Sequence, residues 1–101
     1  MRWLNWAALL FQEAPLRTVL QPESLREEGG FLTLVALTDA RVPQAQVVSG
    51  LNTILTGRGE SPTTTADSVS VARWGLTISV APVAGTQVRV TVRVSTAAPP
   101  P

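Results

Sequence analysis

Cysteine, histidine, tyrosine and lysine are all absent from this 101-residue sequence, and their absence narrows its possible chemistry. Without cysteine, the chain has no disulfide, no thiolate metal site and no thiol nucleophile. Without histidine and lysine, it lacks the usual general base near neutral pH, the commonest metal ligand and the amine that forms Schiff bases. We therefore expect a protein that is not an enzyme, with no catalytic residue, no bound metal and no cofactor.

Charge is also scarce. Charged residues make up 15% of the chain and hydrophobic residues 45%, with a formal net charge of +1, whereas soluble proteins average roughly 25% charged residues. So small an excess of positive charge predicts no specific nucleic-acid partner. A surface with few charges must be apolar or hydroxylic over a larger share, and such surfaces commonly end up covered by a partner protein.

Apolar runs long enough to cross a bilayer are missing too. The run from Trp3 to Phe11 covers about nine residues and is interrupted by Asn5, whereas a transmembrane helix needs about 20. The segment that follows, residues 12–15, offers no small-residue cleavage site for a signal peptide. We expect a chain that is not transmembrane and has no membrane partner.

The length predicts one domain. We assign residues 1–96 to a single α+β domain, in which residues 1–14 form an N-terminal apolar helix or arm and residues 57–68 form a long Thr-rich loop. Residues 97–101 form a proline tail, for which we expect an extended polyproline conformation.

Helical periodicity is present in two segments. Apolar residues follow helical spacing between Trp3 and Glu13, and Pro15 predicts the end of that helix. A second amphipathic helix is predicted near residues 45–56, although Gly50 within it costs about 1 kcal/mol relative to alanine. Residues 16–20 fit a helical turn or a strand equally well. Residues 21–30, with Pro22 early, acids next and glycines last, predict a short helical turn.

Strand patterns dominate the rest of the chain. Residues 31–38 are almost continuously apolar, which predicts a strand buried on both faces. Residues 69–80 alternate on either side of Gly75 and predict two short strands or one bent strand. Four valines alternate with polar residues and predict a half-buried strand from Gln87 to Ser95, and a turn at residues 81–85 predicts an antiparallel hairpin. The fold class is therefore α+β with a small antiparallel sheet, either sandwich- or barrel-like or an open layer.

Two patterns suggest chemistry only weakly. Glu27 and Glu28 are adjacent, which is more typical of a solvated turn than of a catalytic or cation-binding pair. Gly57, Arg58 and Gly59 have the composition of an anion-binding turn. However, the longer glycine frame of a phosphate loop is missing, so a flexible loop is the simpler interpretation.

Partner-binding residues are predicted in two places. Tryptophan is enriched where large contact areas form, so Trp3 and Trp6, with Leu10 and Phe11, are candidates for docking onto another subunit. The alternatives are that they pack on the domain's own sheet or lie on a membrane surface. The membrane alternative is weak because Arg2 is the only basic residue nearby.

The second place is the polar face of the last strand. Arg89 and Arg93 share that face, where they would either keep a valine-rich strand from stray edge pairing or pair with acids of a neighbouring subunit, such as Glu27 or Glu28. Phosphate binding is a third alternative.

These features predict a non-enzymatic structural or assembly subunit of a large symmetric particle, for example a phage virion head or tail component. Its partners would be copies of itself and other structural proteins, with no small-molecule substrate, and it would reside in the virion or the cytoplasm. The alternative is a small protein-binding module that recruits a partner by strand addition or through its N-terminal Trp helix.

Overall fold

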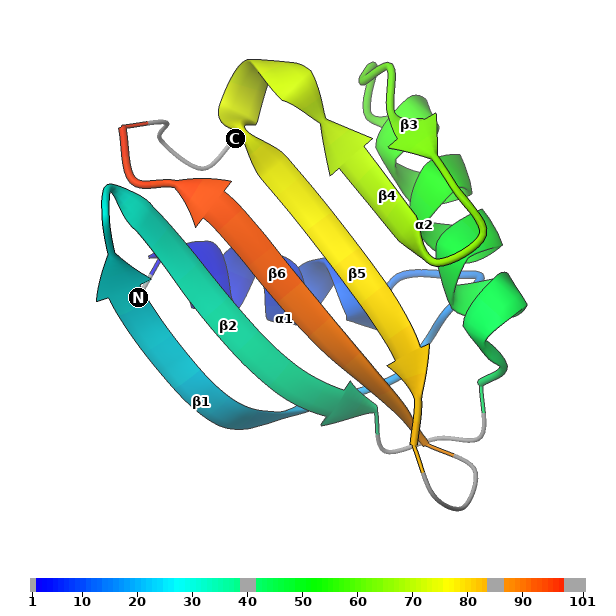
Figure 1. The fold of residues 1–101 in the computed structure, drawn as a ribbon. Helices are drawn as coiled ribbons and strands as arrows, with labels where there is room; N and C mark the ends of the chain where they lie inside the picture. Colours follow the sequence, from blue (N-terminus) through cyan, green and yellow to red (C-terminus); the bar gives the residue numbers. More distant parts are fainter. Residues whose placement is uncertain (1, 39–41, 84–86, 98–101) are drawn as a thin grey trace.

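The computed structural model describes residues 2–38, 42–83 and 87–97. These residues form two α-helices, six strands and one short 3-10 helix (Figure 1), which confirms the α+β class. In chain order the elements are α1 (Arg2–Gln12), β1 (Leu20–Glu28), β2 (Phe31–Thr38), α2 (Gln44–Gly57), β3 (Thr63–Thr64), β4 (Ser68–Val71), η1 (Ala72–Trp74), β5 (Leu76–Pro82) and β6 (Val88–Ser95).

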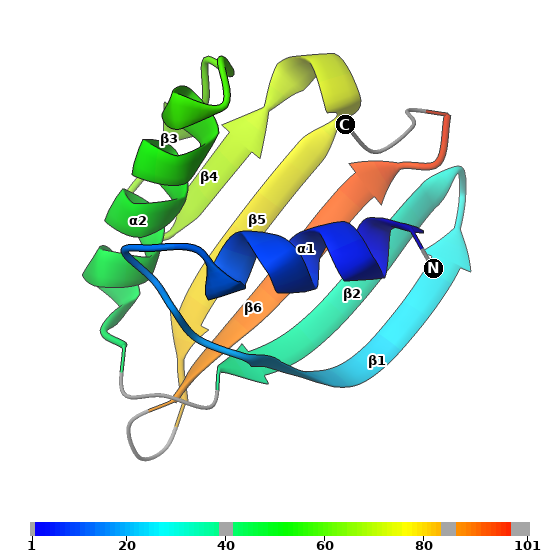
Figure 2. The same ribbon diagram turned by 180° about the vertical axis from the view of Figure 1, so that it is seen from behind.

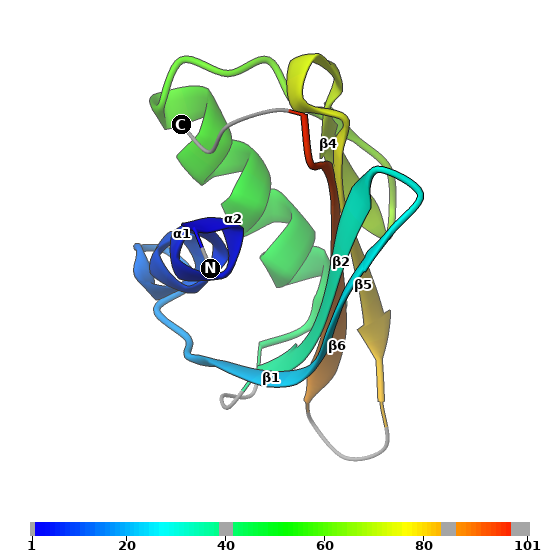
Figure 3. The same ribbon diagram turned by 90° about the vertical axis from the view of Figure 1, so that its left-hand side faces the viewer.

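The six described strands form one antiparallel sheet in the order β1-β2-β6-β5-β4-β3. Both helices lie against the same face of this sheet, and no helix or strand of the described residues covers the opposite face (Figures 2 and 3). The sheet is thus an open layer rather than a sandwich or a barrel. Its two edges are β1 and β3.

The helices form where the apolar spacing predicted them. The buried arc of α1 includes Trp3, Trp6, Leu10 and Phe11, which face the core. Five large apolar side chains of α2 are buried at helical spacing, and Gln44 at its start donates from Nε2 to the carbonyl of Val80 at 2.7 Å, which fixes the helix to β5.

The hairpin of β5 and β6 is confirmed, with Val80 paired to Val90. On β6 the four valines are buried and Arg89 and Arg93 are exposed, as the alternation predicted. For β2 the strand is confirmed, but burial on both faces is wrong. Alternate residues of β2 are buried, and the rest, including Phe31, Val35 and Leu37, are half-buried because the helices cover only one face.

The helical turn predicted at residues 21–30 is wrong, since most of this segment is the strand β1. It pairs with β2 over its whole length, apart from a register shift between Pro22 and Ser24. Gly29 and Gly30 connect the two strands with φ of 60° and 80°, as a tight type I′ hairpin turn requires. The glycines that looked like a helix end are therefore the turn of a hairpin.

Residues 57–68, predicted as a loop, include the two-residue strand β3, which pairs with β4. The bend predicted at Gly75 lies between two strands, with η1 inserted before the glycine. Of the ambiguous residues 16–20, the last begins β1. The predicted proline tail lies outside the described residues from 98 onward, as do residues 84 and 85 of the predicted turn.

Candidate interaction surface

The residues predicted to dock through α1 lie in the core of the same chain. Leu10 and Phe11 are fully buried, and Trp3 and Trp6 are nearly so. The two tryptophans meet edge to face at 5.0 Å between ring centroids, and Trp74 of η1 packs against them at 6.2 and 5.9 Å. This arrangement matches the alternative in which the tryptophans pack within the domain.

The cluster of three tryptophans links α1 to the end of β4, a contact that the spacing of Trp74 in the sequence did not indicate. A partner could reach these rings only if α1 moved away from the sheet. Deleting the segment before Gln12 would therefore remove part of the core, so such a deletion would measure folding rather than docking. A partner role for the helix stays a prediction.

Arg89 and Arg93 are exposed on the outer face of the sheet, the face without helices, and both have contacts within the chain. Nε of Arg89 donates to Oε1 of Glu23 at 2.9 Å, across the intervening strand β2. The guanidinium carbon of Arg93 lies 3.6 Å from the ring centroid of Phe31. The two arginines thus partly cover the apolar residues of β2, a contact that the sequence did not predict. Pairing with a neighbour's acids stays a prediction.

The guanidinium of Arg58 already has a carboxylate partner within the chain. Arg58 forms an ion pair with Glu13 and so joins the end of α2 to the end of α1. Nearby, Nη2 of Arg73 donates to Oε2 of Glu60 at 2.6 Å. Arg73 and Glu60, with Gly59 and Ser61, border a shallow hollow of about 300 Å³. Each described charge of this hollow already has an opposite charge beside it.

The edge strand β1 is exposed along most of its length. Eight of its nine residues are exposed, and Leu20 is buried. Leu25 pairs with the buried Leu34 and therefore points to the helix side of the sheet, where it is 38% exposed. A large apolar side chain at an unpaired edge is the opposite of the charged residues that usually protect such edges.

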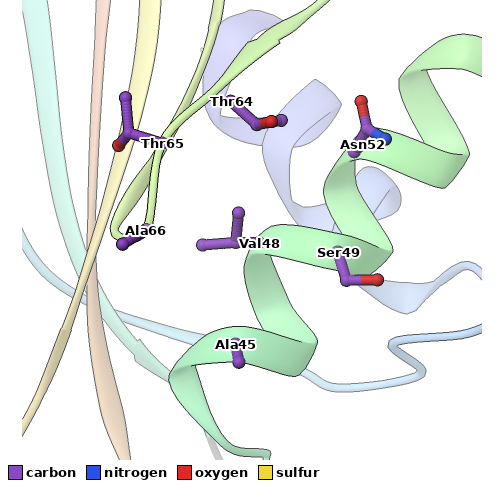
Figure 4. A pocket seen from close by; sticks show the side chains of 7 residues that line it. All are labelled: Ala45, Val48, Ser49, Asn52, Thr64, Thr65 and Ala66. Carbon is purple, nitrogen blue, oxygen red and sulfur yellow. The ribbon is translucent and has the colours of Figure 1, made fainter.

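At the other edge, a groove of about 340 Å³ lies between α2 and β3 (Figure 4). Val48 points into it from the helix and Thr64 from the strand. Its lining consists of methyl, hydroxyl and amide groups only, from Ala45, Val48, Ser49, Asn52, Thr64, Thr65 and Ala66. Such a lining can hold a peptide segment by packing and hydrogen bonds, but it offers no acid, base or nucleophile strong enough for catalysis.

No group of three acidic side chains that could hold a metal ion occurs among residues 2–38, 42–83 and 87–97. Within the same ranges, neither helix has the length and hydropathy that a bilayer crossing requires. In comparisons with known proteins, no family model, curated protein or solved structure matches this chain.

Proposed function

We propose that this protein is a non-enzymatic assembly subunit, which joins copies of itself and other structural proteins into a large symmetric particle such as the head or tail of a phage virion. The observation that carries the proposal is the open edge strand β1, which is exposed along eight of its nine residues. An unpaired strand edge presents a row of backbone N–H and C=O groups that can pair with another chain.

Two further features support an assembly role. The described helices cover one face of the sheet only (Figure 3), and on the other face the guanidinium of Arg93 covers Phe31, one of the half-buried apolar residues of β2. The groove beside β3 is lined by uncharged groups, and the hollow beside Arg73 holds a single acid, Glu60, which is already paired with that arginine. A virion or a cytoplasmic particle is where such a subunit would act.

The experiment is sedimentation velocity of the purified full chain from micromolar to millimolar concentration, with electron microscopy of the heavier fractions. We expect species of several chains that grow with concentration and show a defined symmetry. A folded monomer over the whole range would contradict self-assembly.

A second candidate function is a binding module that accepts a strand from a different protein. The groove beside β3 favours it, because strand addition to an edge combined with a side-chain groove is a common way to recognise peptides. A folded monomer that captures an extended peptide in this groove would support this function instead.

A further inference from the structure

The directions of the six strands decide how a second copy can extend the sheet. Each strand is antiparallel to its neighbour, so β1 and β3 at the two edges run in opposite directions. Consider a second copy that is related to the first by a rotation about an axis parallel to the strands. The helices of both copies then lie on the same side of the continuous sheet. β1 of the second copy lies antiparallel to β3 of the first copy, which is a favourable arrangement for strand pairing.

The register brings Leu25 level with the groove. Residues directly opposite one another in the five strand pairs form a transverse row on the helix side of the sheet. From β1 to β3, this row contains Leu25, Leu34, Val92, Ile78, Val69 and Thr64. Without a shift of register, Leu25 of the next copy would therefore lie directly opposite Thr64, at the rim of the groove.

Shape and polarity agree with this placement. Leu25 points to the helix side of the sheet, and the groove lies on that side, between α2 and β3. Ala45, Val48 and Ala66 provide an apolar surface within it, and its volume of about 340 Å³ exceeds that of a leucine side chain. Insertion of Leu25 would remove an apolar side chain from water at the edge where it is exposed.

At one end of the two edges, two acids of the next copy come beside the arginine–glutamate pair of the hollow. In the same register, Glu27 and Glu28 of the next copy lie opposite Pro62 and Ser61, beside the hollow that includes Arg73. The side chain of Arg73 is 65% exposed and uses Nη2 for Glu60. A guanidinium has five N–H donors, so Arg73 can bind a second carboxylate.

We propose that β1 of one copy adds antiparallel to β3 of the next, with Leu25 in the groove between α2 and β3 and with the Glu27–Glu28 end beside Arg73. Copies then join head to tail through two different edges. Such contacts close into a ring when a whole number of the rotations between neighbouring copies makes 360°, and otherwise they give a filament. This inference rests on the proposed function and names the surfaces that carry it.

The competing explanation is that β1 is protected against pairing. Pro22 lacks an N–H, and the register shift beside it distorts the strand, both of which are devices that protect edges. The proline and the register shift lie in the first part of the strand, whereas the exposed charges Arg26, Glu27 and Glu28 in its second part are of the kind that also protects edges. The segment from Ser24 to Glu28 is regularly paired with β2, and it contains the exposed Leu25.

The test uses the absence of cysteine from the chain. Leu25→Cys and Thr64→Cys are prepared separately, mixed and gently oxidised. Opposed residues of an antiparallel pair have Cα atoms about 4.5 to 5.5 Å apart, within the range of a disulfide. We expect a cross-linked dimer with one chain of each variant, and only background cross-linking when either variant is oxidised alone.

The control mixture combines Leu9→Cys with Thr64→Cys, because Leu9 is 61% exposed on α1 and lies outside the proposed contact. Only background cross-linking is expected. A second pair of variants avoids disulfide chemistry: Leu25→Asp should weaken association at least about tenfold by placing a charge in a groove that offers no opposite charge, whereas Leu9→Asp should not. Circular dichroism checks that each variant is folded.

The outcomes separate the two proposals. Efficient cross-linking of Leu25→Cys to itself would overturn the head-to-tail contact in favour of a two-fold contact between β1 strands. If wild-type protein assembles but Leu25 and Thr64 never cross-link and Leu25→Asp associates normally, the inference fails and the proposed function stands. Wild-type protein that remains a monomer would overturn the proposed function itself.

Discussion

Any side chain at Gly50 would disturb the packing between α2 and the segment after α1. A Cβ atom at this position would lie 2.5 Å from Cδ2 and 2.8 Å from Cγ of Leu16, which is buried. The sequence alone treats Gly50 as a weak point of the helix, whereas the structure uses it for close approach.

Gly50→Ala should therefore lower the free energy of unfolding by about 1 to 3 kcal/mol, because overpacking outweighs the gain in helix propensity. The matched control is Gly57→Ala in the last position of the same helix, where a Cβ meets nothing within 4 Å. It should leave stability unchanged or raise it by up to about 1 kcal/mol. Urea unfolding followed by circular dichroism measures both, and equal effects at the two positions would contradict the packing argument.

The contribution of the tryptophan cluster to stability can be tested at Trp74. Its ring is buried against Trp3 and Trp6, so Trp74→Ala should cost about 3 to 5 kcal/mol of unfolding free energy. Leu9→Ala removes an apolar side chain of the exposed surface and should change stability by less than about 0.5 kcal/mol. A loss below about 1 kcal/mol for Trp74→Ala would show that the cluster is not part of the stable core.

At the scale of elements, the β1–β2 hairpin depends on the two glycines of its turn, which have positive φ. Gly29→Asn should be tolerated within about 0.5 kcal/mol, because asparagine adopts this conformation in type I′ turns. Gly30→Val should cost about 1 to 2 kcal/mol, since a β-branched side chain is strained there. Thermal unfolding compares the variants, and a neutral Gly30→Val would contradict the turn geometry.

The spacing of apolar residues predicted those elements in which it follows one clear helical or strand period. The alternation of Val88 to Val94 was sufficient for β6, and the apolar spacing of residues 45–56 was sufficient for α2. The segment 21–30 was mispredicted because Pro22 and the acids that follow resemble a helix start, while the pairing with β2 that decides its conformation is a contact between segments. Tertiary pairing outweighs weak local propensity of this kind.

The candidate surface was less predictable than the fold. The apolar periodicity identified Trp3 and Trp6 as important without showing whether they face the core or a partner. Leu25 looked like part of a helical turn, and only its position at the edge of the sheet makes it exposed. The groove beside β3 joins residues from α2 and from the loop after it, so it exists only once the chain is folded.

At the scale of the whole molecule, the order of the strands predicts how amide protection is distributed. β6 lies between β2 and β5, so its backbone groups have partners on both sides, whereas β1 and β3 have a partner on one side only. In dilute solution, hydrogen exchange should be slowest in β6 and fastest in β3 and in the amides of β1 that point away from β2.

Head-to-tail assembly should change this pattern at both edges together. When the protein concentration is raised, the amides of residues 24–28 and 61–65 that point toward the other copy should become more protected by the same factor, because one contact covers both segments. Amides of β6 serve as the internal control and should exchange at an unchanged rate. Hydrogen exchange read by NMR or mass spectrometry measures the three segments in one sample. Protection that grows in residues 24–28 alone would instead indicate pairing of β1 with β1, since that contact leaves β3 exposed.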